Sequence, residues 1–398
     1  MTAPILPSDI QVSDVAVVGA GIAGASLAYA LAPHARVLLL EREEQPGYHA
    51  TGRSAALFMA SYGPPQVRAL SLTSEEFLRH PPDGFASGPL LSPRGALMVA
   101  APDQMAALDA HWEVMRTLSA TSRRLDAAEV LVLVPSLRPE RVGGGLLEAD
   151  ASDMDVHAIH QGYLRGARQH GMRVICSAAV RGLLHTGTGW HISTTAGHFL
   201  ARTVVNAAGA WADQVGVMAG ARPLGLLPCR RSAMTFAAPG GVDVRHWPMV
   251  IGVDEDWYFK PDAGVLLGSP ANADPVEPHD VVPEELDIAM AIDRIEHNTT
   301  MQIRRPLRTW AGLRSFVADG GLVGGFDPQV PGFFWLAAQG GYGIQTSPAM
   351  GQACAALIRG EAWPAALTRH GITADALSPD RLRNESRVPS VGGSNARQ

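Results

Sequence analysis

The chain has 398 residues, which is long enough for two domains. Hydrophobic residues make up 46% of it and charged residues 18%, as in a globular protein with a well-buried core. The net charge of −6 argues against a nucleic-acid-binding protein, because such proteins carry a basic face.

Neither a signal peptide nor a membrane span is apparent in the sequence. Residues 1–13 lack a basic n-region and a long apolar stretch, and no run reaches the roughly 18 apolar residues that a membrane span needs. Cys176, Cys229 and Cys354 are widely spaced, which predicts free thiols in a reducing compartment. We therefore expect a cytoplasmic protein, with attachment to the periphery of the inner membrane left open.

The first predicted elements form a βαβ unit. Residues 14–18 are a short β-branched run, typical of a strand buried on both faces. A helix is expected over 22–31 and a second apolar strand over 36–40, ending at Glu41. The fold is therefore expected to begin with a nucleotide-binding half.

The middle of the chain is less regular. An amphipathic helix is predicted over 157–170, followed by a strand at 173–176. Residues 179–200 indicate antiparallel strands around a Gly-Thr-Gly turn, and 203–206 indicates another buried strand. Strand-like runs follow at 231–236, 257–260, 264–268 and 333–338.

Residues 19–24 carry the pattern GxGxxG between a strand and a helix. In this pattern Gly19 makes a tight turn, Gly21 lets a pyrophosphate approach the backbone, and Gly24 packs the helix on the strand. The helix N-terminus offers free N–H groups to the phosphates. Glu41 at the end of the second strand can accept hydrogen bonds from ribose hydroxyls, which favours FAD or NAD over NADP.

Two later turns decide between FAD and NAD. A strand ends in the small residues Asn206-Ala-Ala-Gly209-Ala-Trp211, which allow close packing beside a dinucleotide. A third turn, residues 339–347, precedes a helix for which we expect Ser347 as N-cap and Pro348 at the first position. The N-terminus of that helix could stabilise negative charge on a reduced flavin. An NAD enzyme has no use for these turns, so the prediction is FAD.

These elements predict an α/β fold, with a Rossmann-type FAD-binding domain and an inserted α+β substrate domain on a mostly antiparallel sheet. The FAD-binding domain is expected to be discontinuous, over 13–93, 150–223 and 313–378. The substrate domain is expected over 94–149 and 224–312, and 379–398 is expected to be a disordered tail. The histidines show no HxH or HExxH spacing, so we expect no metal site.

Four segments resemble the D-amino acid oxidase superfamily of flavoproteins, and within it the bacterial D-arginine dehydrogenases. They are VVGAGIAGAS (17–26), GYHATGRSAA (47–56), VNAAGAWAD (205–213) and QGGYGIQTS (339–347). The resemblance implies non-covalent FAD and hydride transfer from the substrate Cα to flavin N5. The imino acid that is formed would hydrolyse to a 2-keto acid and ammonia.

Cofactor-binding positions follow from the same resemblance. They are Gly19, Ala20, Gly21, Ile22, Ala23, Gly24, Glu41, Arg42, Arg53, Ser54, Ala55, Ala56, Val180, Ala208, Gly209, Trp211, Gly340, Gly341, Tyr342, Gly343, Ile344, Gln345 and Thr346.

The resemblance places the substrate carboxylate against Arg231, Arg314, Tyr62, Tyr258 and the Gly341 backbone. The chemistry agrees, because a guanidinium binds a carboxylate bidentately. Arg230 is an alternative to Arg231, and strand alternation allows only one of them to face the flavin.

Three positions depart from the D-arginine dehydrogenase pattern. The acidic residue that meets the substrate guanidinium there is Ala96 here, a histidine is Leu57, and a threonine is Met59. A desolvated substrate cation without a partner is costly, whereas each buried methylene contributes about 0.8 kcal/mol. We therefore predict a preference for apolar over basic D-amino acids.

The electron acceptor and the amine leave alternatives open. Sarcosine oxidase has an oxygen-activating lysine in a Gly-Leu-Lys-Leu-Gly strand, and residues 264–268 here contain none. This favours a dehydrogenase that passes electrons to a quinone or an electron-transfer protein, although oxidase activity stays open. The alternatives are an N-methyl amino acid or glycine oxidase, and a non-catalytic FAD-binding subunit.

Overall fold

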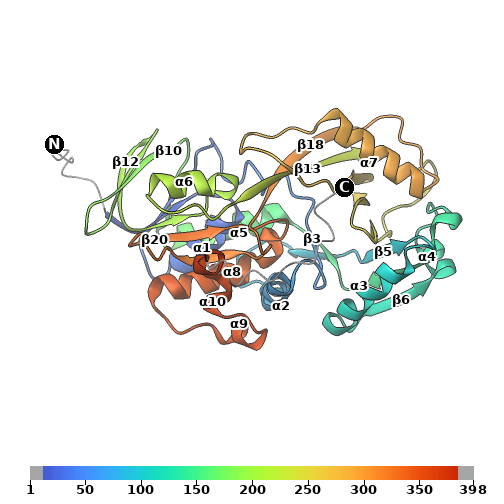
Figure 1. Ribbon diagram of the computed structural model, residues 1–398, viewed down its shortest axis with the longest axis horizontal. Helices are drawn as coiled ribbons and strands as arrows, with labels where there is room; N and C mark the ends of the chain where they lie inside the picture. Colours follow the sequence, from blue (N-terminus) through green and yellow to red (C-terminus); the bar gives the residue numbers. More distant parts are fainter. Residues whose placement is uncertain (1–11, 384–398) are drawn as a thin grey trace.

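Two large β-sheets are the main elements of the computed structural model, which describes residues 12–383. Figure 1 shows one sheet with β12 and β20 on the left and the other with β13, β18 and β5 on the right. No helix in residues 12–383 is long and apolar enough to cross a membrane.

The first sheet has eight strands and a parallel centre. Its order is β10 (Val180–His185), β11 (Trp190–Thr194), β12 (Gly197–Asn206), β1 (Val12–Val18), β2 (Val37–Leu40) and β9 (Arg173–Ile175), with β20 (Phe333–Ala337) and β19 (Val323–Phe326) beside β12. β1 pairs in parallel with β12 on one side and β2 on the other. Every residue of β2 and β20 is buried, as expected of parallel strands covered on both faces.

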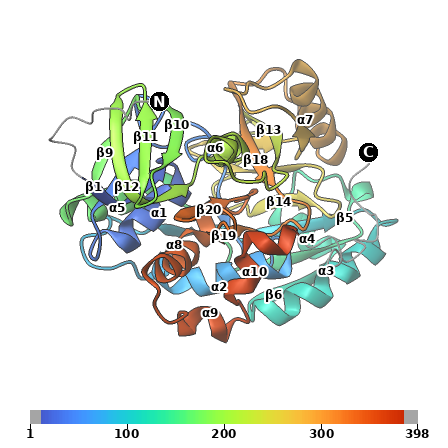
Figure 2. The same cartoon turned by 60° about the vertical axis from the view of Figure 1, so that its left-hand side comes forward.

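Helices cover one face of this sheet. They are α1 (Ile22–Leu31), α2 (Pro65–Arg79), α5 (Val156–Gln169) and α8 (Gly343–Arg359), which Figure 2 shows below β9, β10 and β11. Val15 and Val17 point into their core, whereas Ala16 and Val18 face the opposite core, which α6 (Ala212–Met218) helps to cover. This alternation is the period of two that a strand imposes.

β12 corrects one prediction. The sequence indicated separate strands within 179–200 and at 203–206, but Gly197–Asn206 is one continuous strand. Its first half pairs antiparallel with β11, and Val204–Asn206 pairs in parallel with β20. A single strand therefore carries both the antiparallel hairpin and the parallel core.

The second sheet has nine strands and is almost entirely antiparallel. Its order is β17 (Asp274–Pro275), β13 (Leu227–Phe236), β16 (Val265–Ser269), β15 (Tyr258–Asp262), β14 (Met249–Gly252), β5 (Ala96–Ala100), β7 (Gly144–Glu148) and β6 (Ser122–Asp126), with β18 (Arg308–Phe316) beside β13. Only β14 and β5 pair in parallel. One face packs on α4 (Ala127–Leu133) and α7 (Glu285–Asn298), and part of the other packs on α3 (Met105–Leu118).

A third, small sheet connects the two large ones. It consists of β3 (Leu57–Phe58), β8 (Ser152–Met154) and β4 (Leu91–Pro93). Phe58 packs into the helix-covered core of the first sheet, whereas Leu57 packs on Met249 and Tyr258 of the second. The segment after residue 56 is therefore shared by both halves of the molecule.

The predicted fold class is confirmed, and most predicted elements form close to their expected bounds. The helix over 22–31 is α1 itself, and the helix expected over 157–170 is α5. Strands of the second sheet come from residues 96–148 and 227–316, so β18 crosses the expected boundary at 312/313. The domain boundaries stay a prediction.

The last long helix begins earlier than predicted. Its N-cap is Tyr342, so Ser347 and Pro348 lie inside α8. Proline has no N–H for the Ile344 carbonyl, and the Ser347 hydroxyl donates to that carbonyl instead, over 2.8 Å. The serine therefore replaces the bond that the proline removes.

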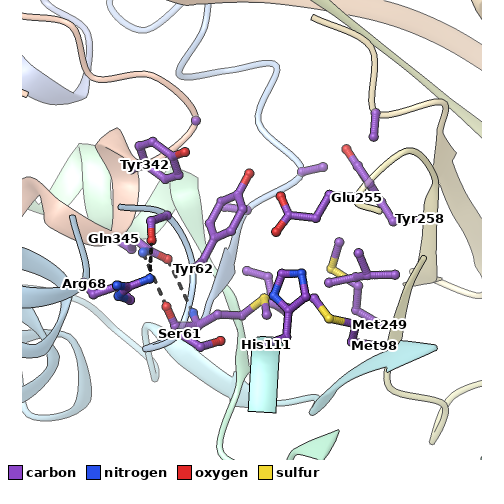
Figure 3. Close-up of a pocket in the computed structure, with 18 of the residues that line it drawn as sticks. Ser61, Tyr62, Arg68, Met98, His111, Met249, Glu255, Tyr258, Tyr342 and Gln345 are labelled. Carbon is purple, nitrogen blue, oxygen red and sulfur yellow. Dashed lines mark hydrogen bonds between the residues drawn. The ribbon is translucent and has the colours of Figure 1, made fainter. Parts of the chain in front are cut away.

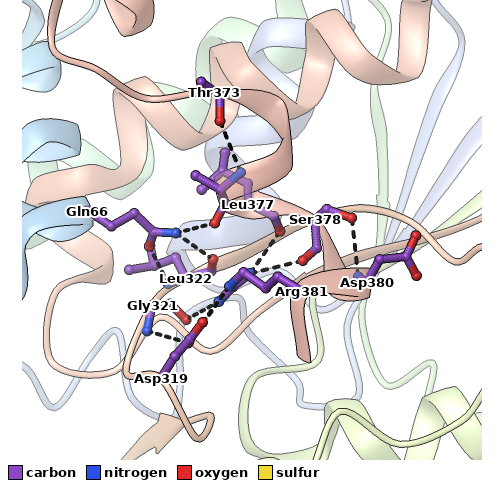
Figure 4. A network of polar contacts seen from close by, with 10 residues as sticks. Gln66, Asp319, Gly321, Leu322, Thr373, Leu377, Ser378, Asp380 and Arg381 are labelled. Carbon is purple, nitrogen blue, oxygen red and sulfur yellow. Dashed lines mark hydrogen bonds and ion pairs between the residues drawn. The ribbon is translucent and has the colours of Figure 1, made fainter. Parts of the chain in front are cut away.

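The chain is folded beyond the point where the disordered tail was expected. After α9 (Ala365–Arg369) and α10 (Ala374–Leu377), Pro379–Leu382 forms a 3-10 helix. Arg381 makes two hydrogen bonds to Asp319, of 2.7 and 3.1 Å, in the polar network of Figure 4. The rest of the expected tail lies outside the described residues.

Candidate functional site

The glycine turn between β1 and α1 has a backbone that only glycine fits. Gly19 has a φ of +104°, and a Cβ on it would lie 2.3 Å from the Ala207 carbonyl oxygen. A Cβ on Gly24 would lie 1.9 Å from the Gly19 carbonyl oxygen. The chain therefore leaves a bare backbone surface at the end of β1.

Glu41 is held beside this turn. Its Oε2 accepts a hydrogen bond from the Ala20 N–H over 2.9 Å, and its Oε1 accepts one from the Glu43 N–H over 3.0 Å. The side chain is buried at the edge of a groove. A carboxylate has further lone pairs, so Glu41 can still accept hydrogen bonds from two ribose hydroxyls.

Most predicted cofactor residues line a continuous series of cavities. The first, of about 450 Å³, contains Gly19, Gly21, Ile22, Ala23, Glu41, Arg42, Val180, Ala208, Gly209, Trp211 and Gly340. A smaller one, of about 100 Å³, shares Ile22 and Gly340 and adds Arg53, Ser54, Ala55, Gly341, Gly343 and Ile344. Ala56, Tyr342 and Gln345 line a third, whereas Ala20, Gly24 and Thr346 lie buried behind the walls.

Aromatic and cationic groups close one end of the groove. The Arg42 guanidinium lies 4.6 Å from the centre of the Trp211 ring, and the His49 ring lies 4.7 Å from the same ring. His49 and Thr51 were not among the predicted residues, although both belong to the 47–56 segment. The bare glycine backbone, the carboxylate and these aromatic and cationic groups fit a dinucleotide with free ribose hydroxyls.

Three arginines line the next cavity: Arg68 on α2, which donates to the Gly63 carbonyl, and the pair Arg231 and Arg314. Arg231 on β13 and Arg314 on β18 both line it, and within residues 12–383 neither forms an ion pair. Burial and the neighbouring Arg314 guanidinium lower the pKa of Arg231. Two half-buried cations this close favour an anion between them.

The neighbouring residue Arg230 points to the other face of β13. Its guanidinium pairs with Asp287, with Nε 2.8 Å from Oδ2, and also with Glu284. Arg231 is therefore the arginine that faces the cavity, which decides between the two candidates.

Two tyrosines and a glycine complete this end of the cavity. The Tyr62 hydroxyl accepts a hydrogen bond from Arg314 Nη1 over 3.2 Å, and Tyr258 lines the cavity together with Arg231. A Cβ on Gly341 would lie 2.7 Å from Arg314 Nη1, so its backbone borders the guanidinium. All five residues predicted to bind the substrate carboxylate therefore line one cavity.

The cavity has a volume of about 960 Å³, and beyond the tyrosines apolar and polar side chains both line it. Leu57 and Met59 line it, as predicted, and Figure 3 shows Met98 and Met249 on its far wall. These two methionines were not predicted to line the cavity. Met249 and Ile251 alternate along β14, the strand before Tyr258, and this alternation could have indicated them. The remaining apolar lining residues include Val114, Met115, Met154 and Val253.

Ala96 lies behind the cavity wall. It is 2% exposed and packs with Leu57, Met59 and Tyr258. Its partner on the adjacent strand is the buried carboxylate Glu148. The structure therefore places Ala96 beneath the lining that Leu57 and Met59 form.

Polar residues stand at the outer part of the cavity. His111 on α3 and Glu255 after β14 both line it, and Figure 3 shows Glu255 beside Tyr62 and Tyr258. Glu255 is exposed and has a φ of +54°, which is uncommon for a residue with a side chain. Sequence patterns carried no signal for either residue.

Position 266 does not face the cavity. Leu266 is fully buried in the core beneath α7, whereas Leu267 points to the cavity side. A side chain at position 266 therefore points into this core and away from the cavity. The single lysine, Lys260, is buried and donates to Asp153 Oδ1 over 2.6 Å and to the Ala56 carbonyl over 3.5 Å.

A family model described as DAO, FAD dependent oxidoreductase, matches residues 14–357. Glycerol-3-phosphate dehydrogenase 1 of Mycobacterium bovis is 26% identical over 207 residues, 50% of this chain and 40% of that protein. The chain thus spans about two fifths of the length of the curated relatives it first matches.

Solved structures share the fold over most of the chain. Glycine oxidase from Geobacillus kaustophilus has a TM-score of 0.77 and 23% identity, covering 88% of this chain and 95% of that chain. FAD-bound L-alpha-glycerophosphate oxidase from Mycoplasma pneumoniae has a TM-score of 0.79 and 18% identity, covering 88% and 95%. At these identities the likeness establishes the fold.

Proposed function

The chain belongs to the DAO family of FAD-dependent oxidoreductases and binds FAD, and from this premise we propose that it oxidises D-amino acids with apolar side chains. The observation that carries the proposal is the pair Arg231 and Arg314, which share one cavity without a carboxylate partner within residues 12–383. That cavity adjoins the dinucleotide groove through Ala55, Gly341 and Ile344.

The arginine pair supports a substrate with a carboxylate. A guanidinium presents parallel N–H donors that match the two carboxylate oxygens, and hydrogen bonds between charged groups are the stronger kind. Tyr62 and Tyr258 add two hydroxyl groups beside the guanidinium groups. A bound carboxylate would fix the Cα of the substrate at one end of the cavity, on the side of the groove.

The protein residues need only bind and orient the substrate. When bound, FAD supplies the acceptor for the hydride that leaves the substrate Cα. The substrate ammonium has to lose a proton first, and water molecules in the open cavity can carry it to the solvent. The resulting imino acid hydrolyses to a 2-keto acid and ammonia, and no further protein group is required.

The cavity lining supports an apolar substrate side chain. Leu57, Met59, Met98, Met249 and Ile251 surround the space beyond the tyrosines. Each methylene buried there contributes about 0.8 kcal/mol. Asp254 and Glu255 are the carboxylates that line the cavity, and both are exposed at its outer part. A basic side chain would therefore have to reach the solvent-exposed rim for a partner.

The D-amino acid proposal is tested by anaerobic reduction of the flavin, followed by its loss of visible absorbance. We expect D-Leu, D-Met and D-Phe to reduce it faster than D-Arg and D-Lys, and the L-enantiomers not to reduce it. A kcat/KM for D-Arg above those for the three apolar substrates would contradict the side-chain preference. Reduction by sarcosine alone would contradict the D-amino acid assignment.

Glycine and N-methyl amino acids form the second candidate class. Its support is the fold shared with glycine oxidase and matches to dimethylglycine dehydrogenases of 26% identity over 37% of this chain. The apolar side chains Leu57, Met59 and Met249 favour the first candidate, because glycine and sarcosine have no side chain to bury against them. The non-catalytic alternative would show no flavin reduction by any of these amines.

The electron acceptor is proposed to be a quinone or an electron-transfer protein. Hydrogen peroxide formation at air saturation, with no other acceptor added, measures the competing oxidase reaction. A peroxide rate equal to the rate with an artificial acceptor would make the protein an oxidase. A close similarity to D-arginine dehydrogenases and the cytoplasmic location stay predictions.

A further inference from the structure

Glu148 is a fully buried carboxylate without a cationic partner. It ends β7, has 0% exposure, and forms no ion pair with any lysine, arginine or histidine among residues 12–383. Taking a carboxylate out of water is costly unless its oxygens are satisfied by hydrogen bonds. Burial raises the pKa of Glu148, which agrees with this cost. The hydrogen bonds of Glu148 therefore identify what the buried group holds in place.

All of these bonds come from the two residues before Tyr62. Glu148 Oε1 accepts from the Ala60 N–H over 2.7 Å and from the Ser61 N–H over 3.4 Å. Glu148 Oε2 accepts a short hydrogen bond from the Ser61 hydroxyl. Figure 3 shows Ser61 and Tyr62 next to each other on the cavity wall. One carboxylate thus fixes two successive backbone N–H groups and a side chain.

The same wall has two weaker anchors farther from the tyrosine. Gln345 bonds to the Met59 N–H and carbonyl, each over 3.4 Å, and Lys260 Nζ lies 3.5 Å from the Ala56 carbonyl. On the other side of Tyr62 the chain continues into Gly63, which has a φ of +88°. There Arg68 Nη1 donates to the Gly63 carbonyl over 2.9 Å. Glu148 therefore anchors the residues just before Tyr62, and Arg68 anchors the residue just after it.

Tyr62 needs a defined position, because its hydroxyl accepts from Arg314 Nη1 over 3.2 Å. Its ring also packs edge-on against Tyr342, with the ring centres 4.9 Å apart. We propose that Glu148 is a positioning residue that holds Ala60 and Ser61 so that Tyr62 presents its hydroxyl to Arg314 and the substrate carboxylate. This inference rests on the proposed function, since it assumes that a carboxylate binds there.

A purely structural role predicts a loss of stability and nothing specific to Tyr62. A positioning role predicts that Glu148→Ala and Tyr62→Phe weaken carboxylate binding through the same lost contact. The two effects then fail to add when the substitutions are combined. The holoenzyme can be titrated with benzoate, a carboxylate without an amine, and the flavin absorbance change gives the Kd.

We expect Tyr62→Phe and Glu148→Ala each to raise the benzoate Kd about tenfold, near the lower end of what one hydrogen bond to a charged group contributes. In the Tyr62→Phe background, Glu148→Ala should change the Kd by less than twofold. Glu148→Gln should stay near the wild-type Kd, because the amide can accept from Ala60 and donate to the Ser61 hydroxyl. Ser61→Ala should lie between the wild type and Glu148→Ala.

Asp327 offers a matched control. It is a second buried carboxylate, 5% exposed, which bonds to Trp335 and Arg383. Asp327→Asn should lower the unfolding temperature and leave the benzoate Kd unchanged. If Glu148→Ala does not retain FAD, Ser61→Ala replaces it. The effect of Ser61→Ala on the benzoate Kd is then compared in the wild type and in the Tyr62→Phe variant.

Two results would overturn the positioning role. One is a wild-type Kd in Glu148→Ala, or in Ser61→Ala where that variant replaces it. The other is that this substitution weakens benzoate binding equally in the wild-type and Tyr62→Phe backgrounds. A Tyr62→Phe variant with the wild-type Kd, or a wild-type protein that does not respond to benzoate, would instead contradict the carboxylate site. The inference about Glu148 would then fall with it.

Discussion

Arg314 on β18 lies diagonally across from Arg231 on β13, because Arg314 pairs with Cys229 and Arg231 pairs with Gly312. Residues directly opposite each other in an antiparallel pair point to the same face, so both guanidinium groups face the same cavity. Gly312, directly opposite Arg231, contributes no side chain that would compete for this space. The sheet register alone therefore creates a site with two positive charges.

The first prediction concerns these two arginines. Arg231→Met and Arg314→Met should each lower kcat/KM about a hundredfold, because a hydrogen bond to a charged group contributes about 1.5–3 kcal/mol. Each should also abolish the flavin absorbance change with benzoate. Steady-state kinetics on the best D-amino acid would measure the effect. A kcat/KM within threefold of the wild type in either variant would contradict the assignment.

The neighbouring arginine should behave in the opposite way. Arg230→Met leaves Asp287, which is 2% exposed, without its guanidinium. Breaking a buried ion pair from one side costs about 3–5 kcal/mol. We expect a lower urea midpoint with an unchanged KM in the folded enzyme. An unchanged midpoint together with a raised KM would mean that Arg230, and not Arg231, serves the substrate.

The third prediction concerns side-chain selectivity. Ala96→Glu restores the acidic residue of the D-arginine dehydrogenase pattern, but it places a second buried carboxylate directly opposite Glu148. Two carboxylates this close cannot both ionise at low cost. We expect kcat/KM for D-Arg to stay within threefold of the wild type in Ala96→Glu. It should rise at least tenfold in Ala96→Glu combined with Glu148→Gln. A gain in Ala96→Glu alone would contradict this reasoning.

The fourth prediction is a pH dependence at the glycine turn. His160 on α5 is buried and its Nε2 lies 2.8 Å from the Ala20 carbonyl oxygen. Burial lowers the pKa of His160 in the folded protein. As pH falls below about 6.5, the unfolded chain takes up a proton that the folded chain does not, so the free energy of unfolding decreases.

Urea unfolding of the holoenzyme at a series of pH values would measure this loss. The loss should begin near the ordinary histidine pKa and continue down to the lowered folded pKa. His160→Gln should be less sensitive over the same interval, because an amide can donate to the Ala20 carbonyl without titrating. If the free energy of unfolding changes with pH equally steeply in the wild type and in His160→Gln, His160 is not the cause.

The local parts of the site could be predicted from the sequence. The turn at Gly19–Gly24 and its partner Glu41 depend on a strand, a glycine pattern and a helix that are adjacent in the chain. Strand alternation likewise predicted that only one of Arg230 and Arg231 faces the site. It could not say which one, because that depends on which face of β13 meets the first domain.

Contacts between distant segments could be predicted only where the resemblance implied them, as for Tyr62, Arg231 and Arg314. Glu148 and Ser61 are separated by 87 residues, and no periodicity links them. The N-terminus of α8 was misplaced for a related reason. Pro348 normally marks the first turn of a helix, but here the Ser347 hydroxyl supplies the bond that lets the helix continue through it.

The three partner strands of β12 also determine when the cofactor groove can form during synthesis. β12 can pair at once with β11 and with β1, which the ribosome has already released. Its other neighbour, β20, follows only at Phe333–Ala337, together with the turn at Gly340 and Gly341 that closes the groove. The chain therefore completes nearly all of the second sheet before it can bind FAD. FAD retention consequently reports on folding of the last part of the chain, whereas the glycine turn at its start is necessary but not sufficient.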